Sequence, residues 1–405
     1  MKNKNITIVI ENILYGGTTT HLINFINSKS CKDYKFKIIT NKNNSAIDTI
    51  KKSCDKKQIS VIEYQSLNCL ELKSIILKVL FFLFKPILFF LSIIQMFIIL
   101  KNIKSEVVLL NCGGYGDFRS EMAAAISLKF LEKKKIFLLI HHCYTKAKVW
   151  NFLINLINKI ISTLFITIIF VSKSTKNSIK ENTNLIGKKT KCKIIYNGLN
   201  IKKIKTQNLK QLKTKRGVKK IGILARIEEY KGHLDLVHSF SNLKNKEKEK
   251  FKVFFIGGGD NKFLNKLNKL ILEKKLKKYF KIINFINNES YTILKNLDLT
   301  LSLTKDFEGF GYSIAESLYV ETPVIATSVG GVKEYLNNKV ANIIKSGDRE
   351  SVTKLLRDFL SNENSWKKKV KRGKKLIINN FNSEKMSKEF LNVFNEKKLN
   401  DWLRG

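Results

Sequence analysis

Two carboxylates frame a glycine-rich turn in the segment "TKDFEGFGYSIAE", and this setting, more than their spacing, suits a ligand rich in hydroxyl groups. Glu308 and Glu316 stand on either side of Gly309, Phe310 and Gly311. A loop carboxylate can accept hydrogen bonds from hydroxyls, one placed a turn into a following helix can accept two from a diol, and glycines allow close approach of the backbone. The purely structural alternative is that Glu308 caps the helix and Glu316 is solvated.

The loop "LARIEEYKGH", residues 224–233, carries two cations of the kind that bind phosphates. Arg226 offers a planar fork of donors and Lys231 a compact point charge. Each charge-assisted hydrogen bond contributes about 1.5–3 kcal/mol, which is enough to hold a diphosphate without a metal ion. The alternative is that both are ordinary surface cations in a chain with 75 Lys and Arg residues.

A histidine pair and a glycine pair mark the N-terminal half. His141 and His142 follow an apolar run in "LIHHCYTK", in a chain with only five histidines. Such a pair is a candidate for acid–base chemistry or for hydrogen bonding to a ligand, although a structural imidazole fits equally well. No acidic or thiol partner stands at metal-ligand spacing, so we predict no metal site. Gly16 and Gly17 turn the chain after the first predicted strand, and Thr18–Thr20 begin a predicted helix whose N-terminus is expected to face a cleft.

The elements that must position these residues alternate between short apolar strands and longer helices. This alternation is typical of parallel, doubly wound sheets, in which ligands bind at the carboxyl ends of the strands. The predicted strands are 6–10, 36–40, 59–63, 107–111, 136–141, 166–172, 192–197, 220–225, 251–257, 297–303, 323–328 and 340–344. The predicted helices include 21–28, 119–131, 313–319 and 383–398.

The strands fall into two series, which indicates two Rossmann-like domains. A chain of 405 residues exceeds the usual size of one core. Residues 201–220 are basic and poor in large apolar side chains, which is typical of a linker. We therefore predict one Rossmann-like domain at 1–200, a second at 201–380 and a C-terminal helix at 381–405. By its amphipathic pattern alone, this helix can pack on either domain.

Residues 72–100 stand apart because they are almost entirely apolar. The stretch approaches the length that spans a bilayer, but Lys78, Lys85 and Pro86 interrupt it and predicted strands flank it. A true crossing would divide the sheet. We predict a helix or helical hairpin in the membrane interface over 72–103, with the lysines at the headgroups. The alternative is a pair of buried crossover helices.

The charge and cysteine content limit the partners and the compartment. The net charge of +42 favours an anionic partner, and no module that interleaves basic and aromatic residues points to nucleic acid. We therefore expect an anionic membrane surface and no nucleic acid. The six cysteines show no C-x-x-C spacing, and the N-terminus lacks the apolar core of a signal peptide. The expected location is cytoplasmic, peripheral at the inner face of the cell membrane.

Taken together, these motifs resemble the retaining glycosyltransferases of family 4, which have the two-domain GT-B fold. "EGFGYSIAE" is similar to the family's E-x7-E block, and "ETPVIATSVGGVKEYL" resembles its usual continuation. "RIEEYKGH" resembles the donor motif, and "IIYNGLN" resembles the Asn-Gly at the domain junction. Many members have glycine where this chain has Glu321, a difference expected to affect only a turn.

The resemblance implies a role for each matching position. Arg226 and Lys231 would hold the donor diphosphate, and Glu316 would take the ribose hydroxyls. Glu308 would bind the transferred sugar, helped by the backbone of Gly309, Phe310 and Gly311. In the first domain, Gly17 would face the donor, and His141 would contact the sugar or the incoming hydroxyl. The choice of His141 over His142 stays open.

The prediction is thus a GT-B enzyme that moves a sugar from a nucleotide donor to a lipid-linked or glycan acceptor in surface-polysaccharide assembly. By the resemblance, residues 1–200 would form the acceptor-side domain and residues 201–380 the nucleotide-sugar-binding domain, facing each other across a cleft. The helix in 381–405 would pack back towards the first domain. Transfer would retain the anomeric configuration and need neither a metal nor another cofactor. Two alternatives remain: a nucleotide-sugar epimerase of the same fold, and a basic nucleic-acid- or lipid-binding scaffold without catalysis.

Overall fold

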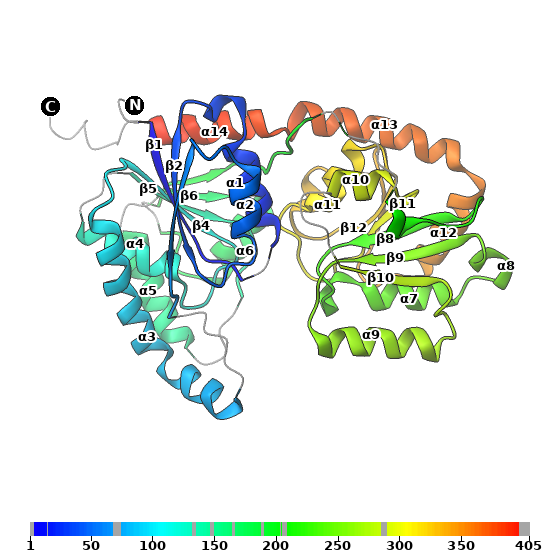
Figure 1. The fold of residues 1–405 in the computed structure, drawn as a ribbon, viewed down its shortest axis with the longest axis horizontal. Coiled ribbons are helices and arrows are strands. Elements are labelled where there is room, and N and C mark those ends of the chain that lie inside the picture. Colours follow the sequence, from blue (N-terminus) through cyan, green and yellow to red (C-terminus); the bar gives the residue numbers. More distant parts are fainter. Residues whose placement is uncertain are drawn as a thin grey trace. The chain divides into compact units, whose positions relative to one another are not determined.

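The computed structural model divides the chain into two compact units (Figure 1). Unit 1 comprises residues 1–200 and 383–405, and unit 2 comprises residues 201–382. The structure describes residues 4–13, 15–67, 74–131, 135–145, 150–163, 167–187, 190–202, 204, 209–284 and 290–396. Residues 72–73, five positions of the predicted linker (203 and 205–208) and the end of the last predicted segment, 397–405, lie outside these ranges.

Unit 1 contains a seven-stranded parallel sheet in the order β3-β2-β1-β4-β5-β6-β7. The chain first builds the sheet to one side of β1 and then returns to β4 on the other, so the switch point lies between β1 and β4. The strands are β1 (Asn5–Ile10), β2 (Lys35–Asn41), β3 (Ile59–Tyr64), β4 (Val107–Cys112), β5 (Lys135–Ile140), β6 (Thr167–Phe170) and β7 (Cys192–Ile194).

Apolar side chains on both faces of this sheet make two cores. Val9 faces the core formed with α3 to α6, whereas its neighbours Ile8 and Ile10 face the core formed with α1, α2 and α14. The helices are α1 (Gly17–Ile26), α2 (Ile47–Ser53), α3 (Ile75–Lys101), α4 (Ser120–Phe130), α5 (Asn151–Thr163), α6 (Lys173–Asn182) and α14 (Ser383–Asn395). Phe390 of α14 packs against Phe25 of α1, so the last helix is part of unit 1.

Unit 2 contains a six-stranded parallel sheet in the order β10-β9-β8-β11-β12-β13, with its switch point between β8 and β11. The strands are β8 (Lys219–Leu224), β9 (Phe251–Ile256), β10 (Phe280–Ile283), β11 (Leu299–Ser302), β12 (Val324–Thr327) and β13 (Asn342–Ile344). The helices are α7 (His233–Ser241), α8 (Asn245–Lys248), α9 (Asn261–Glu273), α10 (Ser290–Lys295), α11 (Tyr312–Tyr319), α12 (Arg349–Ser361) and α13 (Glu363–Asn380). Short 3-10 turns include η3 (Glu229–Lys231) and η4 (Gly330–Glu334).

The prediction of two parallel, doubly wound sheets is confirmed, and the predicted strands match to within a few residues. Sequence reasoning missed β10, a four-residue strand whose apolar run is interrupted by Lys281. The apolar segment forms one continuous helix, α3, and neither a hairpin nor a pair of helices. By length and composition alone, Ile76–Lys101 would suffice to cross a bilayer, and no other helix among the described residues meets that criterion.

Candidate functional site

The two halves of the predicted donor site meet at the switch point of unit 2. Lys231 lies on the loop after β8, and Glu308 lies on the loop after β11, the strand next to β8. The Nζ atom of Lys231 lies 2.6 Å from Oε2 of Glu308, and both side chains are mostly buried. Thr304 donates a hydrogen bond of 3.3 Å to the same carboxylate oxygen. Open α/β sheets bind ligands at the carboxyl ends of the strands that flank the switch point.

Arg226 joins this pair through Tyr230. The Nη2 atom of Arg226 donates to the Tyr230 hydroxyl at 3.0 Å, and the Lys231 ammonium lies 4.8 Å from the centre of the Tyr230 ring. Arg226 also pairs with Glu228 at 2.7 Å and keeps nearly half of its side chain exposed. The two cations of the predicted phosphate site thus share one loop, with Lys231 inside it and Arg226 at its solvent side.

The pKa of Lys231 is set by opposing effects. Burial of the ammonium by itself lowers its pKa, but the nearby Glu308 carboxylate and the Tyr230 hydroxyl outweigh this effect, so the pKa is raised. Lys231 therefore stays charged at neutral pH. A buried ammonium that is already charged is ready to bind a second anion.

Close backbone packing explains the glycine that follows Lys231. Gly232 has φ of +78°, and a Cβ there would lie 2.2 Å from the carbonyl oxygen of Leu303 at the end of β11. A hydrogen bond of 2.7 Å from the Lys305 amide to the Tyr230 carbonyl ties the same two loops together. Only glycine fits this position, because any side chain would push the loops of Lys231 and Glu308 apart.

The glycine pair 330–331 holds the backbone of Glu308. The Gly331 amide donates to the Glu308 carbonyl at 2.8 Å. A Cβ on Gly330, whose φ is +53°, would lie 2.3 Å from the same carbonyl oxygen. This contact explains why a glycine pair follows the carboxylate block in the sequence: it lets the loop after β12 close directly onto Glu308.

The turn between the two glutamates contains an aromatic anchor. Phe310 is buried and stacks on Tyr335, with ring centres 5.4 Å apart, and also contacts Phe381. The Tyr335 hydroxyl donates to the Phe310 carbonyl at 3.0 Å. Gly311, with φ of +82°, then begins α11. The Phe310 side chain therefore holds the turn in place, and a donor contact from this residue could come only from its backbone.

Glu316 lies within α11 and is buried, with 6% of its surface exposed. Burial raises its pKa to about 8, an effect that a hydrogen bond from Ser290 and the charge of Lys202 only partly oppose. The structural alternative is wrong for Glu316, which is buried and not solvated. The N-cap residue of α11 is Gly311, and the Glu308 carboxylate pairs with Lys231.

In unit 1, His141 lies directly after β5 and is buried. Its Nε2 lies 2.7 Å from Oδ1 of Asn111, and its ring meets the His21 ring edge-on with centres 4.8 Å apart. His21 in turn has Nδ1 3.0 Å from Oδ1 of Asn197. Burial, followed by the two neighbouring histidines, lowers the pKa of His141, and burial lowers that of His21 to about 4. Both rings are therefore neutral at pH 7.

His142 differs from His141 in its surroundings. It is half-buried, and its Nδ1 lies 3.2 Å from the sulfur of the adjacent Cys143. Sequence reasoning named the histidine pair but missed His21, although His21 follows the Gly16-Gly17 turn and is one of only five histidines. Gly17 itself is exposed at the first position of α1.

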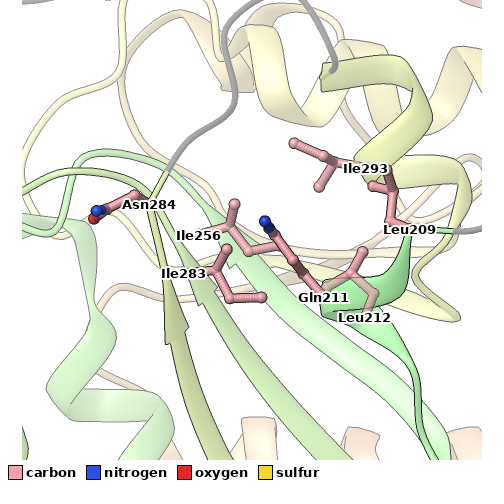
Figure 2. A pocket seen from close by; sticks show the side chains of 7 residues that line it. All are labelled: Leu209, Gln211, Leu212, Ile256, Ile283, Asn284 and Ile293. Carbon is pink, nitrogen blue, oxygen red and sulfur yellow. The ribbon is translucent and has the colours of Figure 1, made fainter.

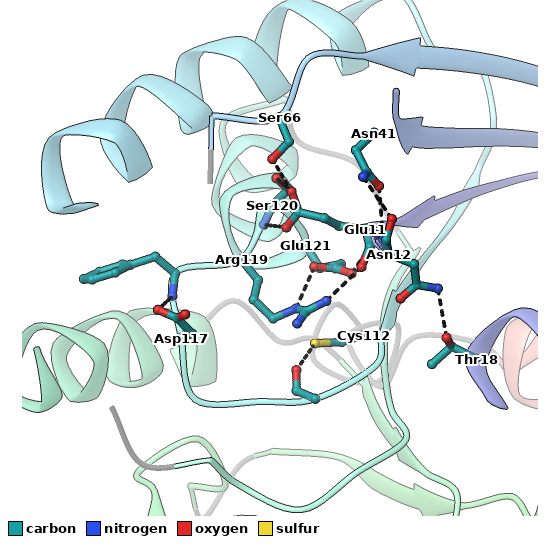
Figure 3. Close-up of polar contacts among 12 residues, drawn as sticks. Glu11, Asn12, Thr18, Asn41, Ser66, Cys112, Asp117, Arg119, Ser120 and Glu121 are labelled. Atoms are coloured by element: carbon teal, nitrogen blue, oxygen red, sulfur yellow. Dashed lines mark hydrogen bonds and ion pairs between the residues drawn. The ribbon is translucent and has the colours of Figure 1, made fainter. Parts of the chain in front are cut away.

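A buried polar cluster fixes the turn that leads to Gly17 (Figure 3). The Glu11 carboxylate accepts hydrogen bonds from the Ser120 amide at 3.1 Å, the Ser120 hydroxyl at 2.8 Å and the Ser66 hydroxyl. Arg119 donates to the Glu11 carbonyl at 2.9 Å and to the Glu121 carboxylate at 3.3 Å. Burial, above the opposing charge of Arg119, raises the pKa of Glu121. Sequence reasoning missed this cluster because its members come from three separate segments.

A small hollow lies beside the carboxyl ends of β9 and β10 (Figure 2). Ile256, Ile283 and Ile293 contribute apolar surface, and Gln211 and Asn284 contribute amide groups. None of the predicted donor residues lines it. Among the residues that the structure describes, no group of three His, Cys, Asp or Glu side chains is placed to hold a metal ion.

Comparison with known proteins supports the fold and suggests a family. Residues 204–376 match the model of the family Glycosyl transferases group 1. A solved structure of HepE from Anabaena, in complex with UDP and glucose, superposes with a TM-score of 0.71 at 13% identity. The superposition covers 96% of this chain and 98% of that one. The family model and this fold support the glycosyltransferase group 1 family, and the predicted GT-B fold class is confirmed.

Two curated relatives match this chain in sequence over part of its length. The chain is 26% identical over 263 residues to an uncharacterized glycosyltransferase of Methanocaldococcus jannaschii, covering 62% of this chain and 63% of the relative. It is 25% identical over 264 residues to the capsular polysaccharide biosynthesis glycosyltransferase CapM of Staphylococcus aureus, covering 60% and 65%. The match thus spans slightly less than two thirds of either relative.

Proposed function

We propose that this chain transfers a sugar from a nucleotide-sugar donor to a lipid-linked or glycan acceptor in the assembly of a cell-surface polysaccharide. The observation that carries the proposal is the Lys231–Glu308 pair at the switch point of unit 2, where a cation for a phosphate and a carboxylate for hydroxyls lie side by side. The family model over residues 204–376 covers this site. The proposed pathway is based on the similarity to CapM of Staphylococcus aureus, a glycosyltransferase of capsular polysaccharide biosynthesis.

In this proposal, donor binding redistributes the partners of the pair. The diphosphate gives Lys231 and Arg226 a stronger anionic partner, because it carries more charge than one carboxylate and offers several acceptor oxygens. Glu308 is then released to accept hydrogen bonds from the sugar hydroxyls. Glu316 accepts the ribose diol, and the backbone of residues 309–311 lines the sugar and phosphate.

The reaction breaks the bond between the anomeric carbon and the leaving diphosphate oxygen and forms a bond from that carbon to the acceptor hydroxyl oxygen. Lys231 and Arg226 stabilise the charge that develops on the departing diphosphate. We further propose that attack occurs on the same face, so configuration is retained, that no divalent metal is required, and that the activity is of the family 4 type. His141 is proposed to contact the sugar or the acceptor hydroxyl.

The proposal is tested by calorimetric titration of UDP-, GDP-, ADP- and CMP-sugars, without metal, into the wild type and Glu316→Ala. We expect one nucleotide diphosphate to bind tightly to the wild type and at least tenfold more weakly to the variant, since two hydrogen bonds to a carboxylate are lost. Absence of binding to every member of the panel would remove the proposal. Interconversion of the bound donor without an acceptor would identify an epimerase instead.

A further inference from the structure

The exposed apolar side chains of the chain concentrate on two helices of unit 1. Of the 21 large apolar residues that are exposed in the described part of the chain, 16 lie on α3 or α5. The most exposed of these 16 residues are Phe152 at 80%, Ile76 at 72% and Phe90 at 63%. Scattered exposed apolar residues need no explanation, but a contiguous set of this size on a protein surface marks a site of interaction. We call the exposed apolar side chains of α3 from Ile76 to Ile98 and of α5 from Phe152 to Ile160 the apolar face.

The two halves of α3 differ in how they are covered. In the C-terminal half, Phe89, Met96 and Leu100 are buried in the core, while Ile94 and Ile98 point to solvent. In the N-terminal half, Ile76–Phe84, apolar residues are exposed around the whole helix, and Figure 1 shows these turns extending beyond α4 and α5. A helix that is apolar all round is stable only in an apolar environment.

One hydrogen bond joins α3 to α5 and makes their exposed residues a single surface. Pro86 cannot donate to the carbonyl of Phe82, four residues earlier in the helix. The indole Nε1 of Trp150 donates to that carbonyl at 3.2 Å, and the Trp150 and Phe82 rings lie 6.3 Å apart. Trp150 immediately precedes α5, and Phe152, Leu156 and Ile160 lie at four-residue spacing on one exposed face of that helix. The proline thus creates the acceptor that holds the two helices together.

The charges around the apolar face identify its occupant. Neither α3 nor α5 contains an Asp or Glu, whereas Lys78, Lys101 and Lys159 are exposed on them. A second copy of the chain, docked face to face, would bring these lysines together, and Asp117, an acidic residue that contacts α3, is already paired with Lys85 at 2.7 Å. An anionic lipid surface supplies both a counter-charge for the lysines and an apolar interior for the side chains.

We propose that the apolar face docks unit 1 onto an anionic membrane, with the exposed apolar side chains of Ile76–Phe84 and of α5 below the headgroups of one leaflet and with Lys78 and Lys159 at the level of the headgroups. Helix α3 does not cross the bilayer, because Phe89, Met96 and Leu100 would have to leave the core of unit 1. The inference rests on the proposed function in one respect: it makes the acceptor a lipid-linked one, which is held in the same leaflet.

The test is flotation of this chain with vesicles of phosphatidylcholine alone and of phosphatidylcholine with about 30% phosphatidylglycerol, which gives the vesicles a negative surface potential. We expect binding to the anionic vesicles, resistance to washing at high salt, and release at alkaline pH as for a protein without a transmembrane segment. The variants Ile76→Ser/Leu80→Ser/Phe84→Ser on α3 and Phe152→Ser/Leu156→Ser on α5 should each lower the partition coefficient at least tenfold. Leu272→Ser, an equally exposed site on unit 2, should leave it unchanged.

Three results would overturn the inference. One is wild-type protein that stays unbound at both lipid compositions, and another is α3 and α5 variants that bind like the wild type. The third is a dimer in sedimentation velocity that dissociates in the α3 variant, since the face would then be covered by a second copy. Nucleotide-sugar binding, measured on the same samples, reports on the proposed function separately, because none of the substituted residues belongs to the proposed donor site. The proposed donor site lies in unit 2, so the folding of unit 1 in the α3 and α5 variants is checked by their thermal unfolding, which should match that of the wild type.

Discussion

The ammonium nitrogen of Lys231 lies 2.6 Å from a carboxylate oxygen of Glu308, and this ion pair joins the loops that follow the two central strands of unit 2. The residues are 77 positions apart in the sequence. Each belongs to a separate motif of the resemblance, one assigned to the diphosphate and the other to the sugar. The donor-free protein therefore holds the two groups ready by pairing them with one another.

Replacing Lys231 with methionine should weaken binding of the nucleotide diphosphate about 10- to 150-fold, because a charge-assisted hydrogen bond of about 1.5–3 kcal/mol is lost. Calorimetric titration with UDP measures the effect. Lys266→Met is the matched control, since Lys266 also pairs with a glutamate of the same unit, Glu229, but on the exposed surface. Equal affinities for the two variants would contradict a role for Lys231 in the donor site.

Donor binding should release a proton from Glu316 below pH 8. Burial raises the pKa of this carboxyl to about 8, so it is largely protonated at pH 7, whereas a ribose diol donates its hydrogen bonds to the ionised form. Affinity is therefore expected to rise with pH up to about 8. Titrations at pH 7 in buffers of different ionisation enthalpy measure the proton, and Glu316→Gln should show none. A heat of binding that is independent of the buffer would contradict this.

The same shift predicts a pH dependence of stability. Because the folded-state pKa of Glu316 is above its unfolded value of about 4.3, the unfolded state releases its proton first as pH rises, and stability falls between the unfolded pKa and about 8. Glu316→Gln should remove this loss, so its melting temperature should exceed that of the wild type at pH 8 by more than at pH 4.5. Thermal melts of donor-free protein at both pH values test the sign, and an equal difference at the two would refute it.

Gly330→Ala should displace the backbone of Glu308 and lower donor affinity at least tenfold. A Cβ at this position would lie 2.3 Å from the Glu308 carbonyl oxygen and 2.8 Å from its amide nitrogen, so the loop must move. Gly347→Ala is the matched control: Gly347 also has a positive φ, +76°, but a Cβ there meets no atom within 4 Å.

The control variant should lose only about 1 kcal/mol of stability from backbone strain and keep its affinity for the donor. If both glycine variants weaken donor binding equally, the close contact between Gly330 and Glu308 has no role in the site.

His141→Ala should lower kcat at least tenfold, because side chains that transfer protons in the reaction contribute roughly 10²–10⁴-fold. His142→Ala should change kcat by less than about threefold, because no such contribution is expected from it. The reason is that His141 is buried and oriented by Asn111, whereas His142 is half-buried beside Cys143. Steady-state kinetics with the donor identified by calorimetry measures kcat for both variants. A larger effect at His142 would transfer the proposed role to that residue.

Much of the fold is encoded in local patterns, and the sequence therefore predicted it. Apolar runs such as 107–111 and 251–257 became strands because both faces of a parallel sheet are buried. Strand β10 was not predicted, because Lys281 interrupts its short apolar run. The sequence predicted a helix or a helical hairpin around Pro86 and could not choose between them, because the carbonyl that the proline leaves free is satisfied by Trp150, a residue far along the chain.

The candidate site also has a part that the sequence predicted and a part that it did not. Sequence patterns identified Lys231, Glu308 and Glu316 singly, since each follows a strand or begins a helix. The ion pair between the first two depends on β8 and β11 being neighbours, which only the strand order provides. The contact of His21 with His141 and the cluster around Glu11 likewise bring together segments that share no local signal.

The most direct test of the central claim is a crystal structure with the nucleotide diphosphate that binds most tightly in the calorimetric panel. The account predicts the diphosphate at the carboxyl ends of β8 and β11, with Lys231 bonded to a phosphate oxygen and no longer to Glu308, and with the ribose hydroxyls on Glu316. A nucleotide bound elsewhere, with the Lys231–Glu308 pair still intact, would contradict it.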